Sequence, residues 1–319
     1  MWSTGPVLTR VADGRARVVR EIRAAAPLLS DLAAPVPARG PWLTVALNAQ
    51  YARPLARRRP RAVVVERSGL PAGARRELAS GGGQGGPSTD GVALLSFRRR
   101  GLGTGLATAV TLLGADVGPL PPGRPPGRLY ARDDDVASRL AAGVADLLDG
   151  IRGPWTLRLA GLPLGDPTVR HLSAAMPDSS LSTTRSRRLV DELDTVAEVR
   201  RTRDPAGVEE VLPAVLARVP EHQRAFVRAA ARLHASIGQL EVAVVPSAGG
   251  PVAVLLTLLD RRPDGAEDRW PWWGSTDVGG LRRELGSPWV ALTAAAGFAQ
   301  LGRRGRARGS GLSRGTAAR

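Results

Sequence analysis

Two spacings of hydrophobic residues recur along the chain, one typical of helices and the other of strands. Apolar residues three or four positions apart predict helices over residues 14–32, 42–52, 133–149, 166–176, 204–219, 222–237 and 289–301. Alternating or β-branched runs predict strands over residues 62–66, 92–97, 155–160, 182–190, 240–245, 252–259 and 269–275. Because helices and strands alternate, the pattern predicts an α/β (α+β) fold.

Three of the predicted helices begin with an aspartate, whose side chain can accept hydrogen bonds from the free backbone N–H groups there. Asp166 and Asp204 are each followed by proline, and Asp133 is followed by two further aspartates. The run Asp133–Asp135 can also be read as a metal cluster. Its position at a helix start, where the helix dipole attracts negative charge, favours capping.

Segments rich in glycine and proline divide the chain. Residues 80–91 are predicted to form a flexible loop, and residues 117–128 an irregular connector. We predict an N-terminal helix with a proline-rich lead-in (1–40), a first lobe (41–200), a second lobe (201–302) and a disordered arginine- and glycine-rich tail (303–319). The order of two helices, three strands and one helix recurs in the last third, which indicates two lobes of similar build.

Composition excludes several classes of chemistry. The 319 residues include 45 basic ones, all of them arginine, and no cysteine. The absence of lysine excludes a Walker A phosphate site, Schiff-base chemistry and a lysine base. The absence of cysteine excludes disulfides, a thiol nucleophile and zinc knuckles. The three histidines, His171, His222 and His234, are too widely spaced to suggest a metal site, so we predict none.

The net charge of +16 is concentrated at the two ends of the chain. Residues 1–100 hold 17 arginines and 6 acidic residues, residues 101–302 hold 22 and 23, and residues 303–319 hold 6 and none. A solvated basic face with a loose tail explains this distribution. A site for a polyanion is the alternative, but without a recognised module or interleaved aromatic residues nucleic acid is a poor candidate.

No segment of the sequence suggests export or membrane insertion. Residues 1–23 mix charged with apolar residues, unlike a signal peptide. The longest uncharged stretches, 101–115 and 287–301, fall short of the ~20 residues that cross a bilayer. We therefore predict a cytoplasmic protein without a transmembrane segment, and leave peripheral membrane contact and the oligomeric state open.

Motifs in the last hundred residues are similar to those of a known family. A turn at 249–253 (GGPVA) joins two predicted strands, and an aromatic strand ends at 272–277 (WWGSTD) before the last predicted helix. This part of the chain resembles the C-terminal half of tandem GNAT-fold acyltransferases, the group of peptidoglycan-bridge aminoacyltransferases and cellulose-biosynthesis acetyltransferases. The first half matches more loosely, through the helix beginning at Trp42 and the segment Thr108–Val117.

The resemblance implies two GNAT-like lobes, each a mixed, mostly antiparallel sheet flanked by helices. It implies transfer of an acyl or aminoacyl group from a thioester or ester donor, such as acyl-CoA, to an amine or hydroxyl acceptor, with no tightly bound cofactor. In the family a closing strand follows the last helix, and the tail after residue 302 cannot supply one. The second hypothesis is therefore a catalytically degenerate binding or scaffold protein, and the third is polyanion binding through the arginine-rich ends.

One segment matches the phosphate-binding loop of GNAT enzymes. Arg98, Gly101, Gly103 and Gly105 provide glycines that let backbone N–H groups approach a pyrophosphate and an arginine that pairs with it. The residues that follow, such as Val110, favour a strand, which would make the segment an ordinary hairpin loop. Both interpretations stay open.

Other candidates lie in the second lobe. Trp270, Trp272 and Trp273 either belong to a core with a contact between lobes or form the wall of a substrate groove. Asp277 is a candidate to orient an amine or act as a base, with a solvated turn residue as the alternative. Glu241 opens a predicted strand and is a second candidate for a catalytic carboxylate.

Overall fold

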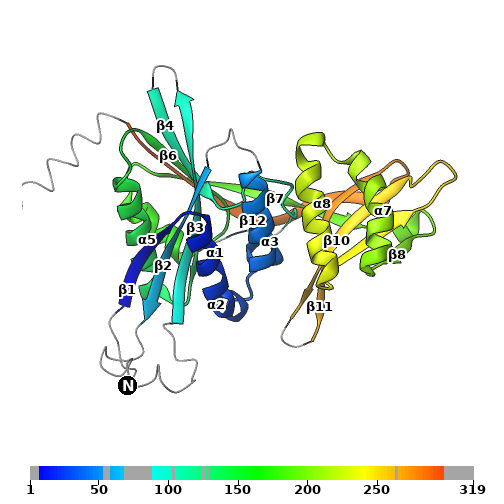
Figure 1. Cartoon of the computed structure of the whole chain (residues 1–319), viewed down its shortest axis with the longest axis horizontal. Helices are drawn as coiled ribbons and strands as arrows, with labels where there is room; N and C mark the ends of the chain where they lie inside the picture. The colour runs from blue at the N-terminus through cyan, green and yellow to red at the C-terminus, as the bar shows by residue number, and fades with distance from the viewer. Residues whose placement is uncertain are drawn as a thin grey trace, which may run out of the picture.

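Two β-sheets, each with helices packed against it, lie side by side along the molecule (Figure 1). The computed structural model describes residues 7–52, 58–67, 88–102, 105–123, 127, 129–262 and 265–297. We call the part built on the larger sheet the first lobe and the part built on the smaller sheet the second lobe. The expected mixed α/β class, with sheets flanked by helices, is confirmed.

The elements have the following bounds. The helices are α1 (Arg15–Ala24), α2 (Ala26–Asp31), α3 (Gly40–Tyr51), α5 (Asp134–Asp149), α6 (Pro167–Ala175), α7 (Pro205–Arg218) and α8 (Glu221–Ser236), with 3-10 turns η1 (Val36–Ala38) and η3 (Leu193–Thr195). The first sheet contains β1 (Val7–Asp13), β2 (Arg58–Arg67), β3 (Ser88–Leu102), β4 (Gly105–Leu112), β5 (Tyr130–Ala131), β6 (Trp155–Pro163), β7 (Ser180–Asp191) and β12 (Leu281–Ala296). The second contains β8 (Arg200–Thr202), β9 (Leu240–Val245), β10 (Ala253–Arg261) and β11 (Glu267–Thr276).

The first sheet is mixed and mostly antiparallel. Its strands follow the order β1-β2-β3-β4-β6-β12-β7, with β5 paired to β3. Among the strand pairs of the described residues, only β4 and β6 run parallel, and a crossover through α5 joins them. Helices α1, α2 and α3 pack on one face, whereas α5 and α6 pack on the other. Apolar residues therefore point both ways from the central strands, as their continuous hydrophobic runs indicate.

The second sheet repeats part of the first. Its strands follow the antiparallel order β8-β9-β10-β11, and a helix pair, α7 and α8, connects β8 to β9. The first lobe begins in a similar way, with β1, then three helices (α1, α2 and α3) and then β2, β3 and β4. Helices followed by three antiparallel strands thus recur in both lobes, but the helix predicted after the three strands of the second lobe is strand β12.

The C-terminal segment corrects a sequence-based expectation. Residues 289–301 were expected to form a helix, with no closing strand after it, but residues 281–296 form β12. This strand lies between β6 and β7 and pairs antiparallel with both. Val290, Leu292, Ala294 and Ala296 are buried while the residues between them are more exposed, a period of two that fits a strand.

Strand β12 also changes the assignment of residues to lobes. The sequence placed residues 281–296 in the second lobe, but their pairing puts them in the first sheet. Residues 7–31, set apart as a lead-in, supply β1, α1 and α2 of that same lobe. The second lobe is therefore an insertion between β7 and β12, two neighbouring strands of one sheet.

Most of the predicted helix boundaries agree with the structure. The side chains of Asp133, Asp166 and Asp204 accept hydrogen bonds from backbone N–H groups at the starts of α5, α6 and α7. The single helix expected over residues 14–32 is divided into α1 and α2, with Pro27 in the first turn of α2. Of the loop predicted over residues 80–91, residues 88–91 belong instead to β3, and residues 80–87 lie outside the described residues, as does the tail at 303–319.

The two lobes share a hydrophobic core. Trp42 of α3 lies 5.3 Å from Phe226 and 5.2 Å from Trp272, measured between ring centroids. The indole N–H groups of Trp270 and Trp272 donate to backbone carbonyls at Pro122 and Pro119, each at 2.8 Å. Backbone carbonyls of the first lobe thus accept hydrogen bonds from the indole N–H groups of tryptophans in the second lobe.

Candidate functional site

The segment that matches a phosphate loop forms part of a β-hairpin. Arg98 and Gly101 lie in β3, Gly105 begins β4, and Gly103 lies outside the described residues. Arg98 pairs with Ala109 across the two strands. Because a strand rather than a helix follows, no helix N-terminus adds its N–H groups there. The hairpin interpretation describes this segment.

The first helix after β4 presents negative charge at its start. Asp133 accepts a hydrogen bond from the backbone N–H of Val136 at 2.9 Å, and Asp134 and Asp135 occupy the first turn. These three carboxylates occupy the position where the helix dipole attracts negative charge, and each of them pairs with an arginine. The N-terminus of α5 is therefore already capped by side chains of the protein.

Asp277 is held as an ion pair. Arg218 of α7 donates to both of its carboxylate oxygens, to the Ser275 hydroxyl at 3.3 Å and to the Pro251 carbonyl at 2.9 Å. Hydrogen bonding to Arg218 lowers the pKa of Asp277 below its ordinary value. A carboxylate with a lowered pKa is a weak base, so its observed role is to fasten β11 to α7.

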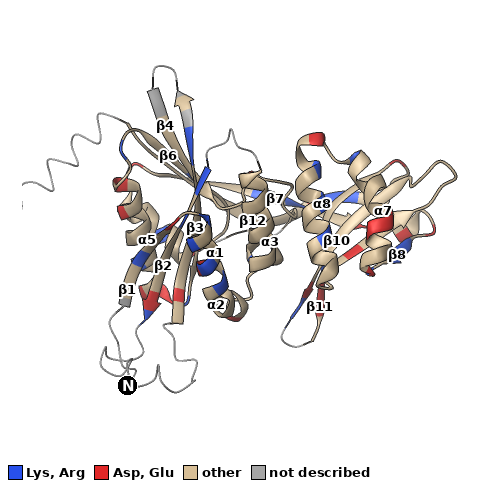
Figure 2. Ribbon diagram, in the orientation of Figure 1, with Lys and Arg blue, Asp and Glu red and all other residues tan. Residues whose placement is uncertain are grey.

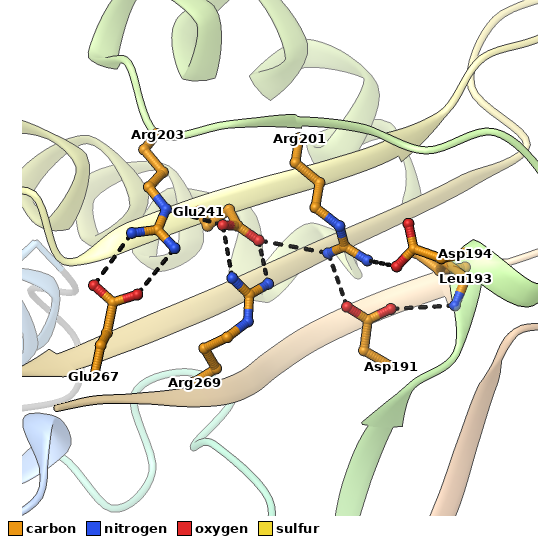
Figure 3. Close-up of polar contacts among 8 residues, drawn as sticks. All are labelled: Asp191, Leu193, Asp194, Arg201, Arg203, Glu241, Glu267 and Arg269. Carbon is orange, nitrogen blue, oxygen red and sulfur yellow. Dashed lines mark hydrogen bonds and ion pairs between the residues drawn. The ribbon is translucent and has the colours of Figure 1, made fainter.

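Glu241 lies at the centre of an arginine cluster on β8, β9 and β11 (Figure 3). It is 4% exposed and accepts hydrogen bonds from Arg203 at 3.0 Å, Arg269 at 2.9 Å and Arg201 at 3.4 Å. Burial raises the pKa of Glu241, but hydrogen bonds from Arg269 and Arg203 outweigh burial and leave it below its ordinary value. Glu241 therefore anchors three guanidinium groups as a carboxylate.

The tryptophan cluster lies in the core that joins the lobes. Trp270 and Trp272 are 5% and 2% exposed, and Trp273 packs against the same core from a half-buried position. Simple alternation would place Trp273 on the opposite face of the strand. A register shift at Leu256/Thr257, where β10 meets β11, interrupts the alternation. None of these three tryptophans lines the groove between α1–α3 and β10–β11.

A groove between the lobes was not indicated by any sequence motif. It has a volume of about 870 Å³ and lies between α1–α3 of the first lobe and β10–β11 of the second. Its lining consists of Ile22, Arg23, Ala26, Leu29, Ser30, Ala33, Arg39, Gly40, Pro41, Thr44, Asp260, Arg261, Arg262 and Asp268. These residues come from segments more than two hundred positions apart, which explains why no local sequence pattern predicted the groove.

The groove combines an apolar floor with positive charge. Ile22 and Leu29 are buried at its base. Arg39 crosses from one lobe to the other and pairs with Asp260 at 2.8 Å. Arg23 and Arg261 are exposed at the groove and have no carboxylate partner in the described part of the chain. These two cations are available to an anionic ligand.

Comparisons with known proteins show distant similarity only. No family model matches the chain, and no curated protein matches it. A probable N-acyltransferase of unknown function from Enterococcus faecalis V583 is 9% identical, with 89% of this chain and 72% of that chain covered and a TM-score of 0.33. A GCN5-related N-acetyltransferase from Anabaena variabilis is also 9% identical, with 90% and 72% covered and a TM-score of 0.31.

A third solved structure is a conserved protein of unknown function from Bacteroides thetaiotaomicron. It is 16% identical, with 53% of this chain and 59% of that chain covered and a TM-score of 0.27. Similarity at this level does not assign a function to the chain. Within the described residues, no helix is long and apolar enough to cross a membrane.

Proposed function

We propose that the protein binds an acyl donor in the groove between the lobes and transfers the acyl group to an amine or hydroxyl. The observation that carries this proposal is the composition of the groove, an apolar floor beneath two arginines without carboxylate partners. An acyl thioester such as acyl-CoA combines an apolar chain with phosphate groups. The floor matches the chain, and the arginines match the phosphates.

Transfer in such a site depends on positioning. The acceptor nitrogen or oxygen attacks the carbonyl carbon, the new C–N or C–O bond forms, and the C–S bond of the donor breaks as the thiol leaves. Asp277 and Glu241 are ion-paired carboxylates with lowered pKa values, so neither is assigned as the base. The acceptor, whether amine or hydroxyl, loses its proton to solvent or to the leaving thiolate, which gives the amide or ester and the free thiol.

Direct titration of the full chain tests the proposal. We expect a long-chain acyl-CoA to bind more tightly than CoA, because only the former covers the apolar floor. The double substitution Arg23→Ala with Arg261→Ala should weaken acyl-CoA binding by about tenfold, the effect of losing ~1.4 kcal/mol of pairing with phosphates. Arg17→Ala, an exposed arginine on the same helix as Arg23 but outside the groove, is the control and should leave the affinity unchanged.

Two outcomes would contradict the proposed binding site. One is the absence of acyl-CoA binding at low and moderate salt. The other is binding that the double substitution and the control weaken equally, since this would indicate general attraction to a basic surface.

The same geometry supports a second function, binding without turnover. The observation that favours it is the engagement of both candidate catalytic carboxylates in ion pairs. Release of free thiol from bound acyl-CoA, measured across a panel of amines and alcohols, separates the two functions. Thiol release that depends on an acceptor supports transfer, and saturable binding without release supports a binding protein.

A further inference from the structure

One face of the second sheet carries no α-helix from the described part of the chain, and a polar cavity opens on it. Helices α7 and α8 cover one face. On the opposite face, Leu193 of η3 packs on a small apolar cluster from β9 and β10. Beside this cluster lies a cavity of about 450 Å³ lined by Asp191, Asp194, Arg201, Thr257, Arg269 and Pro271.

The charged groups around the cavity are held in fixed positions (Figure 3). Arg201 donates to Asp191 at 2.8 Å and also pairs with Asp194. Arg269 binds both oxygens of Glu241, which is nearly inaccessible to solvent. Because each guanidinium is anchored by a carboxylate, the two arginines lose little freedom when they bind a further group.

Several polar atoms of this arrangement retain hydrogen-bonding capacity. Asp194 uses one carboxylate oxygen for Arg201, and no described residue donates to the other. Arg269 uses its terminal nitrogens for Glu241 and keeps its Nε–H. The hydroxyl of Thr257, a residue that is 2% exposed, has no hydrogen-bond partner within the described part of the chain.

The sheet is irregular at Thr257. Thr257 lies opposite Pro271, next to the register shift between β10 and β11. Proline has no backbone N–H and cannot complete the ladder there. Bulges of this kind occur next to binding sites, where they redirect a side chain. A buried hydroxyl without a partner is costly unless a ligand or water completes it.

We propose that this cavity binds a small zwitterion that carries both an ammonium and a carboxylate group, such as a free α-amino acid. The lining holds two arginines and two aspartates. The aspartates repel a simple anion, and the arginines repel a simple cation. A zwitterion complements both signs. Its carboxylate binds Arg269 and the Thr257 hydroxyl, and its ammonium binds Asp194.

Binding of the zwitterion stands independently of the donor site. Its further role, to supply the amine that accepts the acyl group, rests on the proposed transferase function. The two are separable because the groove and the cavity share no lining residue. The groove substitutions Arg23→Ala and Arg261→Ala should leave amino-acid affinity unchanged.

Titration of the full chain with glycine, alanine and serine tests the proposal. We expect millimolar or tighter binding of at least one of them. N-acetylglycine lacks the ammonium and glycinamide lacks the carboxylate, and each should bind at least about tenfold more weakly, as for the loss of a charged hydrogen bond. Failure of all three amino acids to bind, or equal binding of both analogues, would overturn the proposal.

Two substitutions locate the site. Asp194→Asn should weaken amino-acid binding about tenfold, whereas Asp277→Asn, an equally exposed aspartate paired with one arginine elsewhere in the lobe, should not. Thr257→Val keeps the side-chain shape and removes an unpaired hydroxyl, so it should weaken binding without lowering the melting temperature. Binding that is insensitive to both Asp194→Asn and Thr257→Val would place the ligand elsewhere.

Discussion

Buried ionisable side chains are stabilised in this protein in two different ways. Glu241 remains charged because three arginines surround it. His234 is completely buried, and its Nδ1 lies 3.0 Å from the amide oxygen of Gln239. Burial lowers the pKa of His234 to about 4, so the ring is neutral at physiological pH. The same physical cost of burying charge is met by pairing in one case and by neutralisation in the other.

His234 should make the stability of the protein depend on pH. Its pKa falls from 6.5 to about 4 on folding, so the unfolded chain binds more protons between these values and stability decreases as pH falls from 6.5 to 4. The total loss should be about 3 kcal/mol, at 1.36 kcal/mol for each pKa unit. Urea unfolding between pH 5 and 6.5 measures this slope, since carboxylates change little in that range.

The control for this prediction is a second histidine. His234→Gln should remove most of the slope, whereas His222→Gln, at an exposed position near the start of α8, should leave it unchanged. An unaltered slope in His234→Gln would show that another group is responsible.

At the scale of elements, β12 shows how pairing overrides local preference. Its second half is rich in alanine, which favours a helix in isolation. Hydrogen bonds to β6 on one side and β7 on the other require an extended chain there. The alternation of Val290 and Leu292 with smaller or polar residues is compatible with both forms over so short a stretch. Only the two neighbouring strands decide between them.

Strand β12 should therefore contribute strongly to stability. Leu292 is fully buried between the first sheet and its helices, so Leu292→Ala should lower the free energy of unfolding by about 3 kcal/mol. Leu285, on the same strand, is 66% exposed, and Leu285→Ala should change the free energy of unfolding by less than about 0.5 kcal/mol. Equal effects of the two substitutions in urea unfolding would be incompatible with the observed pairing of β12.

At the scale of the whole molecule, the second lobe is tied to the first in three ways. It leaves and re-enters the first sheet through adjacent strands, β7 and β12. Trp42 joins the cores of both lobes, and Arg39 forms an ion pair with Asp260 across the groove. The groove proposed for the acyl donor is therefore formed only when both lobes are folded and joined.

Unfolding of the intact chain should accordingly be a single cooperative transition. Trp42→Ala removes the side chain that contacts Phe226, His234 and Trp272, and should cost about 4 kcal/mol. It should also separate the calorimetric transition into two, one for each lobe. A single transition in both proteins, at similar temperature, would show that Trp42 does not couple the lobes.

Part of the positive charge of the molecule is used in ion pairs within the lobes. Basic and acidic residues occur together in both lobes (Figure 2). Many arginines of the first lobe are already paired, among them Arg10 with Glu21 and Glu66, and Arg58 with Asp116. These ion pairs fix the positions of several arginines within the lobe, while the excess of 17 arginines over 6 acidic residues in the first hundred residues remains.

The amino-acid sequence by itself determined the local features of this protein. Aspartates at 133, 166 and 204 set the starts of three helices because capping depends only on neighbouring backbone groups. Apolar periodicity predicted most strands. The recurrence of two helices, three strands and one helix predicted two similar lobes, although the last of these helices is strand β12 in the structure. Features of this kind depend on residues a few positions apart.

Only the tertiary structure decided which distant residues meet. It placed β12 in the first sheet, joined Trp42 to Trp272, and brought residues 22–44 together with residues 260–268 to form the groove. It also surrounded Glu241 with arginines from β8 and β11, which makes the carboxylate an anchor rather than a base. These outcomes depend on strand pairing and on burial between segments far apart in the chain, and no local pattern specifies either.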